Sequence, residues 1–169
     1  TGYYTIDENS IVLVSTIGKK DKKILSSEDV KNKKIESFSF SQDKKNVLIF
    51  TNSVRVWRYN TRGNYWVYNL KTKQGKRLGS TLPDRSLMFA KFSPNGEKIA
   101  YVSKEIIPNS FRNSSTRANI YLETVEGNSI VKLTESDEKG KIINGTFDWV
   151  YEEEFSCRDG FLFNDNSDK

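Results

Sequence analysis

Histidine is absent from the 169-residue sequence and cysteine nearly so, and both shortages narrow its chemistry. It has no histidine, so a Ser-His-Asp triad, a Cys-His pair and a histidine-ligated metal site cannot be assembled from this chain. Its single cysteine, Cys157, excludes an internal disulfide and a metal site built from several thiolates. We therefore expect no cofactor and no metal, and any acyl-transfer chemistry has to come from another domain.

Long apolar runs are also absent from the sequence. No stretch approaches the length of about 20 apolar residues that a membrane-spanning helix needs. The first residues, 1–5, lack the basic start and apolar core of a signal peptide. We expect neither a signal nor a membrane anchor within these 169 residues.

The net charge of +5 does not by itself indicate a nucleic-acid partner. Most of the excess comes from lysines such as Lys19, Lys22 and Lys33, which lie beside turn-forming residues. A nucleic-acid surface typically combines arginine with interleaved aromatic residues on one face. We interpret the lysines as solvated surface and expect no nucleic-acid binding.

A repeated pattern is the clearest positive feature. Residues 38–50 and 90–101 each predict a short strand, a turn opened by serine, and a second apolar strand, with Phe40 and Phe92 equivalent and 52 residues apart. Candidates for a third and fourth strand follow each copy, at 65–70 and 75–78 and then at 119–124 and 130–133. Four short strands per unit of about 50 residues is typical of a β-propeller blade.

The sequence therefore predicts an all-β fold, a partial β-propeller with about two complete four-stranded blades, partial blades at both ends and a short helical insertion. The expected divisions are a partial blade at 1–34, blades at 35–85 and 86–134, an insertion at 135–157 and the start of a further blade at 158–169. We expect strands at 3–6, 11–16 and 23–25 in the first part and a strand and turn from Phe161 onward in the last. A sandwich of evenly spaced hairpins is the alternative fold.

The repeat is interrupted where the spacing from Phe92 to Phe163 reaches 71 residues. Asp148 predicts a helix N-cap, and the three glutamates of 152–154 follow it in the first turns, where they suit the positive end of the helix dipole. We expect three apolar residues to pack this turn against the protein body: Trp149, Val150 and Phe155.

Composition alone favours a solvated acidic run for Glu152, Glu153 and Glu154. The functional interpretation is a cation site, because two adjacent carboxylates on a helix point about 100° apart and can flank one ammonium group. Calcium fits less well, since it takes six or more oxygen ligands and the sequence has no Asp-x-Asp-x-Asp loop. In the hairpin of residues 54–68, Arg58 is either a stacked surface residue or a donor to a substrate carbonyl.

Several of these segments resemble the dipeptidyl peptidase IV family of prolyl oligopeptidase-type serine peptidases. The resemblance is carried by Asp148-Trp-Val-Tyr-Glu-Glu-Glu154 after Asn144-Gly-Thr, and by Val56-Trp-Arg58 before Tyr65-x-x-Tyr-Asn-Leu70. It implies an eight-bladed propeller over an α/β-hydrolase domain that this chain does not contain. It also implies that Glu153 and Glu154 bind the peptide's N-terminal ammonium and that Arg58 binds a substrate carbonyl, with no direct role for Glu152. The sequence departs from the family pattern after the triplet, at residues 155–160.

The resemblance implies that the parent protein is an exported serine exopeptidase, periplasmic, at the cell surface or membrane-anchored, which releases dipeptides of the X-Pro or X-Ala type. The expected partners of this chain are peptides with a free N-terminus and the parent's hydrolase domain, and the chain alone is not an enzyme. Two alternatives stay open: a non-enzymatic propeller that binds a protein, and a glycan-handling propeller, which needs two carboxylates some 5–10 Å apart on separate elements.

Propeller blades bury their faces on neighbouring blades, so an excised piece exposes faces and strand edges. We predict that the isolated 169-residue chain self-associates through open blade edges or is only marginally stable. Size-exclusion chromatography with light scattering and chemical unfolding test this. A monodisperse monomer that unfolds cooperatively contradicts the prediction.

Overall fold

The computed structural model describes residues 2–31, 33–56, 61–106, 116–137 and 142–167, and these residues are organised almost entirely as β-sheet. The strands are β1 (Gly2–Asp7), β2 (Ser10–Ser15), β3 (Lys22–Ser26), β4 (Ser37–Phe40), β5 (Asn46–Arg55), β6 (Thr61–Asn69), β7 (Gln74–Arg77), β8 (Leu87–Phe92), β9 (Lys98–Ile106), β10 (Thr116–Thr124) and β11 (Ile130–Lys132). A 3₁₀ turn, η1 (Glu28–Val30), follows β3, and one short helix, α1 (Trp149–Glu154), lies near the C-terminus.

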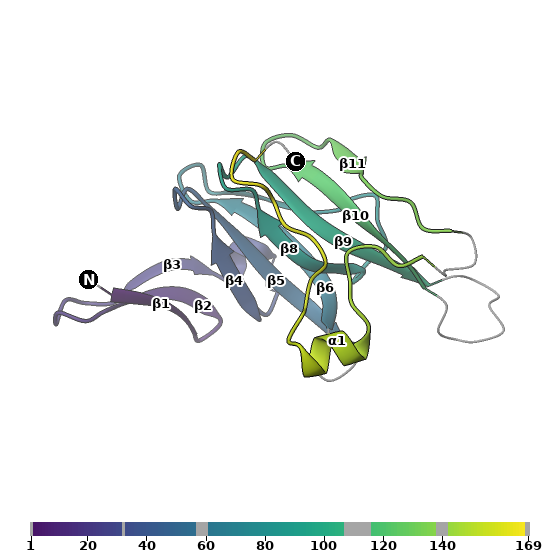
Figure 1. Cartoon of the computed structure of the whole chain (residues 1–169). Coiled ribbons are helices and arrows are strands. Elements are labelled where there is room, and N and C mark those ends of the chain that lie inside the picture. The colour runs from purple at the N-terminus through teal and green to yellow at the C-terminus, as the bar shows by residue number, and fades with distance from the viewer. Residues whose placement is uncertain (1, 32, 57–60, 107–115, 138–141, 168–169) are drawn as a thin grey trace.

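The strands form successive antiparallel meanders (Figure 1). β1, β2 and β3 make a small separate sheet, and the remaining strands follow the order β11-β10-β9-β8-β6-β5-β4, with β7 paired to β6. The larger sheet is two units of four strands, because β6 and β8 are joined only by the residue pair Gly63 and Leu87. The strand expectations for 3–6, 11–16 and 23–25 and for both repeat copies are thus confirmed, with shifts of a few residues at strand ends.

The two copies of the repeat use the same turn chemistry. Ser41 donates its hydroxyl to Asp43 and accepts the N–H of Asn46 at 3.0 Å. Ser93 does the same with Asn95 and with the N–H of Lys98, also at 3.0 Å. Because a serine hydroxyl and an Asx side chain close both turns, the sequence pattern at 38–50 and 90–101 corresponds to a real structural repeat.

The hydrogen bond from the Lys45 backbone N–H to Asp43, followed by those from the Ser41 hydroxyl and the Lys45 ammonium, lowers the pKa of the Asp43 carboxyl to about 2. The Asp43 carboxylate in the turn of the first repeat is therefore negatively charged at any physiological pH.

The core lies between stacked sheets, and β5 is buried on both of its faces. Val47 and Ile49 pack with Ile11 and Leu25 of the small sheet, whereas Leu48 faces Tyr101 and other residues of the next unit. This arrangement explains why residues 47–50 of β5 are continuously apolar rather than alternating, since both faces of the strand meet a neighbouring sheet.

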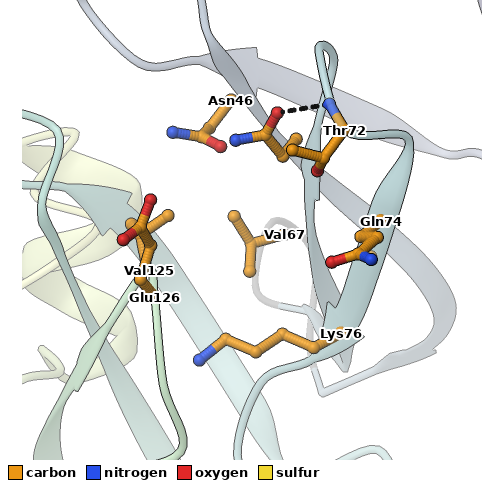
Figure 2. A pocket seen from close by; sticks show the side chains of 9 residues that line it. Asn46, Val67, Thr72, Gln74, Lys76, Val125 and Glu126 are labelled. Carbon is orange, nitrogen blue, oxygen red and sulfur yellow. Dashed lines mark hydrogen bonds between the residues drawn. The ribbon is translucent and has the colours of Figure 1, made fainter.

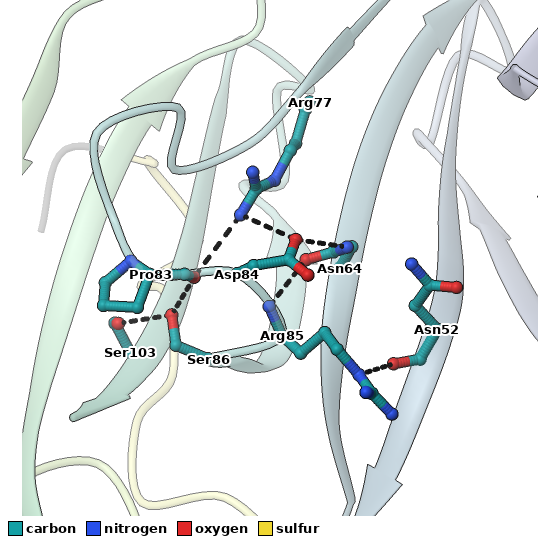
Figure 3. Close-up of polar contacts among 8 residues, drawn as sticks. All are labelled: Asn52, Asn64, Arg77, Pro83, Asp84, Arg85, Ser86 and Ser103. Atoms are coloured by element: carbon teal, nitrogen blue, oxygen red, sulfur yellow. Dashed lines mark hydrogen bonds and ion pairs between the residues drawn. The ribbon is translucent and has the colours of Figure 1, made fainter. Parts of the chain in front are cut away.

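A polar network holds the connection between the two four-stranded units (Figure 3). The Asn64 side chain donates to Asp84 at 3.0 Å and accepts the N–H of Arg85 at 2.9 Å. The Arg85 guanidinium in turn donates to the carbonyls of Asn52 and Ser53, each at 3.1 Å. The connecting loop is thus fixed to β5 and β6 by side chains rather than by strand pairing.

One buried carboxylate also joins the two four-stranded units, by linking β10 of one unit to β7 of the other. Glu123 of β10 is 2% exposed, and its oxygens accept from the Lys76 ammonium, the Gly79 N–H and the Tyr101 hydroxyl, each at 3.0 Å. Lys76 lies on β7 and also donates to the carbonyls of Thr124 and Gly127. Burial, followed by the charge of Glu123 and its hydrogen bond, raises the pKa of the Tyr101 hydroxyl, so this group stays protonated as a donor.

Residues 142–147 and 157–161 form two arms that lie over the outer face of β9 and β10 and carry α1 at their tip (Figure 1). The Asn144 N–H donates to the Ala118 carbonyl at 3.0 Å, and the Gly160 N–H donates to the Gly145 carbonyl at 3.0 Å. The Lys91 ammonium, on β8, holds the returning arm through Asp159 at 2.7 Å. Each arm is therefore tied to the sheet, and the two arms are tied to each other.

The expectation for the last residues is met only in part. The turn is present, with the Ser167 N–H donating to the Asn164 carbonyl, but residues 161–163 pair with no strand among the described residues. Strand geometry is stabilised by a paired neighbour, and Phe161 instead packs beside Met88 and Val102.

We predict that Glu123→Ala destabilises the chain by about 3–5 kcal/mol, because it leaves the Gly79 N–H and the Tyr101 hydroxyl without their buried acceptor and removes the carboxylate that pairs with the Lys76 ammonium. Glu135→Ala is the matched control, since Glu135 pairs with Lys132 at the surface and its side chain is 75% exposed; it should cost less than about 1 kcal/mol. Urea unfolding of the full-length parent protein carrying each variant measures the difference. Equal losses contradict the assignment of Glu123 as a buried link.

We also predict that Gly145→Ala loosens the arms. A Cβ at Gly145 would lie 2.6 Å from Val102 Cγ2 and 2.8 Å from Ile120 Cγ1, whereas at Gly18 nothing lies within 4 Å. Both glycines have nearly the same positive φ, +74° and +73°, so Gly18→Ala carries the backbone strain without the clash.

Gly145→Ala should therefore cost about 1–3 kcal/mol more than Gly18→Ala. It should also speed hydrogen exchange at the Asn144 and Gly160 amides, which tie the arms down. Unchanged protection of these two amides would show that the close approach at Gly145 does not hold the arms.

Candidate functional site

Helix α1 begins where the sequence predicts. The Asp148 carboxylate accepts the N–H groups of Val150 and Tyr151 at 2.9 and 3.1 Å, which satisfies two of the four unpaired donors of the first turn. At the other end, the Tyr151 carbonyl accepts the N–H groups of Phe155 and Cys157. A six-residue helix is marginal by itself, so these caps and the arms on either side define it.

The three glutamates of the triplet are in three different environments. Glu152 is 4% exposed, Glu153 is partly buried, and Glu154 is exposed. Successive residues of an α-helix point about 100° apart, so a helix that turns Glu152 toward the protein body turns Glu154 almost directly away from it. Glu153 and Glu154 are thus the two carboxylates on the accessible side, and their proposed role in ligand binding stays a prediction.

The apolar residues of the helix do not pack as the sequence suggested. Trp149, Val150 and Phe155 are 60%, 36% and 66% exposed, so the expectation that they pin the turn against the body was wrong. Instead, Phe147, Tyr151 and Phe155 form a row of rings with centroids 6.0 and 5.7 Å apart. A helix this short can turn only one face to the protein, and Glu152 occupies it.

Two cations at strand ends, Lys104 and Arg62, interact electrostatically with each other, and Lys104 also interacts with Glu152 of α1. Burial, followed by the positive charge of Arg62, lowers the pKa of the Lys104 ammonium, while the negative charge of Glu152 acts in the opposite direction. Lys104 is near the end of β9 and Arg62 near the start of β6. The site therefore brings together α1 and the ends of two strands.

The sequence analysis missed Lys104 and Arg62, although one signal was available for Lys104. Side chains of a strand alternate between faces, so Lys104 shares a face with Ala100 and Val102, which are 3% and 0% exposed. A lysine that continues a buried apolar face indicates a nearby counter-charge. Nothing in the sequence indicated which carboxylate supplies it.

Arg58 lies outside the described residues, so its predicted role stays a prediction. The base of its hairpin is defined by the pairs Val54 with Arg62 and Arg55 with Thr61. Arg62, at the base of this hairpin, lowers the pKa of the Lys104 ammonium, and Glu152 of α1 raises it. The base of the hairpin therefore lies at the same end of the sheet as α1.

A crevice of about 300 Å³ opens between the two four-stranded units at the other end of the strands (Figure 2). Asn46, Asn69, Gln74 and Val125 line it, which places it at the start of β5 and the end of β10. Lys76 points into the crevice, but its ammonium is bound to Glu123 and to two backbone carbonyls. The crevice thus offers three amide side chains and one carboxylate, that of Glu126, whereas α1 carries two neighbouring carboxylates outside its buried face, and α1 is the stronger candidate for binding a cation.

In the described residues, no helix combines the length and apolar character needed to cross a membrane.

Comparisons with known proteins identify the family of the chain. A profile described as "Dipeptidyl peptidase IV (DPP IV) N-terminal region" matches residues 41–169. The chain is 32% identical over 147 residues to "Prolyl endopeptidase FAP" of Homo sapiens, a match that covers 87% of this chain and 17% of that protein. It is 33% identical over 123 residues to "Dipeptidyl aminopeptidase B" of Saccharomyces cerevisiae, covering 73% of this chain and 13% of that protein.

Among solved structures, the crystal structure of Porphyromonas gingivalis dipeptidyl peptidase 4 has a TM-score of 0.72 at 24% identity, covering 94% of this chain and 21% of that one. This likeness confirms the fold as an all-β propeller segment with a short helix. The chain spans less than a fifth of the length of the two relatives named above. With the match at residues 41–169, these similarities show that the chain belongs to the dipeptidyl peptidase IV N-terminal region family.

Proposed function

We propose that this chain is the substrate-binding part of the propeller of a dipeptidyl peptidase IV-like serine exopeptidase, and that Glu153 and Glu154 bind the N-terminal ammonium of the peptide. The observation that carries the proposal is the orientation of α1, which buries Glu152 and leaves Glu153 and Glu154 toward the accessible side. An α-ammonium has a pKa near 8 and is charged at neutral pH. Two neighbouring carboxylates repel each other, and a bound cation relieves that repulsion.

Such a clamp acts as a ruler for the cleavage position. An extended residue spans about 3.3–3.6 Å, so the second carbonyl of a peptide lies roughly 7 Å from its amino end. Fixing the ammonium presents that carbonyl to a nucleophile of the hydrolase domain, and dipeptides of the X-Pro or X-Ala type are released. A blocked peptide leaves both carboxylates desolvated and unpaired, and it is rejected for that reason.

Arg58 completes the proposed site by donating to a carbonyl of the bound peptide. The planar guanidinium fork suits such a contact, and the base of the Arg58 hairpin is at the same end of the sheet as α1. The exposed rings of Trp149, Tyr151 and Phe155 are available to contact the peptide or the hydrolase domain.

We further propose that β4–β7 and β8–β11 are two complete blades and that β1–β3 belongs to a preceding one. The spacing of 52 residues between equivalent positions, the identical serine-based turns and the single residue pair between β6 and β8 support this division. The arms and α1 are then an insertion after the second complete blade.

The clamp is tested in the full-length parent protein with Gly-Pro and acetyl-Gly-Pro reporter substrates. We predict that Glu153→Gln plus Glu154→Gln lowers kcat/KM for the free-amine substrate by about 100-fold or more, in line with the energy of about 1.5–7 kcal/mol that couples close charge pairs. Glu126→Gln plus Glu135→Gln, which alters two exposed carboxylates away from α1, should leave kcat/KM unchanged.

An activity that is the same for the free-amine and acetylated substrates, and that is unchanged by the substitutions at Glu153 and Glu154, would overturn the clamp. The triplet would then be a solvated acidic surface, and the exposed aromatic row of α1 would favour a propeller that binds a protein partner.

A further inference from the structure

Strand β8 contains a β-bulge that changes which face its second half presents. The register pairs Met88 with Val102 and Lys91 with Ala100, so two residues of β8 lie opposite one residue of β9 between these pairs. In a regular strand, Lys91 would face the opposite side from Met88, three positions earlier. The extra residue of the bulge brings Lys91 back to the face of Met88 and Val102. This is the face on which the arms lie, since Val102 is next to Gly145.

The bulge has a strained backbone that the neighbouring strand supports. Phe89 has a φ of +57°, a left-handed conformation that is uncommon for a bulky residue. Burial raises the pKa of the Tyr65 hydroxyl to about 12, while hydrogen bonds from the backbone N–H groups of Ala90 and Phe89 act in the opposite direction. Tyr65 of β6 therefore binds the backbone of the bulge itself. Strain of this kind persists only where the surrounding structure maintains it, and it is commonly found where a side chain has to be placed for function.

The side chain that the bulge places on the outer face is Lys91. Its ammonium donates to the Asp159 carboxylate at 2.7 Å and to the Phe161 carbonyl at 3.0 Å, and it lies 4.3 Å from the centre of the Phe161 ring. The side chains of Lys91 and Asp159 are 26% and 31% exposed, so water screens this ion pair only in part. Hydrogen bonds between ionised partners are roughly twice as strong as neutral ones. Lys91 thus holds the returning arm by three contacts.

These contacts lie where the two arms join. Asp159 forms an isolated antiparallel bridge with Thr146, and the next residue, Gly160, donates its N–H to the Gly145 carbonyl at 3.0 Å. Thr146 lies three residues before α1 and Asp159 lies five residues after it. A tie at this point therefore acts on both ends of the segment that carries the helix.

We propose that Lys91 is a positioning residue: its ammonium, turned outward by the bulge of β8, fixes the paired arms to the sheet and thereby sets where α1 presents Glu153 and Glu154. The functional consequence rests on the proposed ammonium clamp. The attachment of the arms is a separate structural claim and is measured separately.

The structural claim is tested by hydrogen exchange in the full-length parent protein. Lys91→Met keeps the apolar stem and removes the ammonium, and we expect amide exchange across residues 144–160 to rise by about 10-fold. Asp159→Asn acts from the arm and should have the same effect even where Lys91→Met reduces the yield of folded protein. Lys91→Arg keeps the charge and should keep most of the protection. Lys45→Met is the matched control, since Lys45 pairs with Asp43 at 2.9 Å but its side chain is 73% exposed; it should leave exchange in the arms unchanged.

The functional claim is tested by kinetics with the Gly-Pro and acetyl-Gly-Pro substrates. Lys91→Met should lower kcat/KM for the free-amine substrate by about 10–100-fold, because a displacement of about 1 Å at a binding group is enough for such a loss. Its kcat/KM for the acetylated substrate, which does not use the clamp, should stay the same, whereas a general loss of folded protein lowers both values equally. Lys91→Arg should restore most of the preference for the free amine. Lys91→Met plus Asp159→Asn should match Lys91→Met alone, since both changes remove the same contact.

The outcomes separate the two proposals. Unchanged exchange in both Lys91→Met and Asp159→Asn overturns the positioning role and leaves the clamp to its own test. Faster exchange with an unchanged preference for the free amine also overturns it, provided that Glu153→Gln plus Glu154→Gln lowers activity. Strictly additive losses in the double variant overturn it as well, because they show that Lys91 and Asp159 act independently. Faster exchange combined with no effect of the substitutions at Glu153 and Glu154 supports Lys91 as the attachment of the arms and overturns the clamp.

Discussion

The burial of both faces of the central strands is the constraint on which the rest of this structure depends. In β5, Val47 and Ile49 pack on the small sheet, while Leu48 packs on the next four-stranded unit. Apolar burial is non-directional and stabilises by area, so it brings the sheets together without fixing how they are aligned. The polar links supply that alignment: Glu123 with Lys76 joins β10 to β7, and Arg85 joins the connecting loop to β5.

Alignment of the sheets matters because it sets which strand ends meet. The end of β9, the start of β6 and the arms of residues 142–147 and 157–161 converge at one end of the stack (Figure 1). Function-bearing residues are commonly held on loops by a rigid scaffold, and here the scaffold reaches the loop through backbone hydrogen bonds and through Gly145, whose missing Cβ permits close contact with Val102. The packing of the sheets thereby sets the position of α1 at the tip of the arms.

Helix α1 buries a carboxylate, Glu152, while its aromatic residues Trp149 and Tyr151 are exposed. A helix of six residues has too little area to bury a stable apolar stripe, and an apolar contact tolerates rotation about the helix axis. A buried carboxylate needs a cation or hydrogen-bond donors at defined positions, so it restricts the rotation of a helix more than an apolar contact does. The rings of Tyr151 and Phe155 are exposed and that of Phe147 is partly buried; Phe147 and Tyr151 are stacked, and Phe155 is tilted against Tyr151.

The sequence by itself determined the repeating strands, the serine turns and the start of the helix, because each depends on residues close together in the chain. The 52-residue spacing, the apolar run of β5 and the Asp148 cap all appeared in the structure as the pattern predicted. The family resemblance was readable for the same reason, since Asp148 to Glu154 is one continuous segment.

Tertiary structure alone decided which of three identical carboxylates is buried and which residues of α1 face solvent. Glu152, Glu153 and Glu154 are chemically equivalent in the sequence, and they differ in burial because α1 turns one face toward the protein. The Lys104 ammonium, whose pKa the charge of Glu152 raises, lies 48 residues earlier in the chain, and such proximity depends on the stacking of sheets rather than on local spacing. The apolar character of Trp149, Val150 and Phe155 predicted burial wrongly for the same reason: hydrophobicity favours burial, but only the packing of the whole chain decides whether a surface is available to bury against.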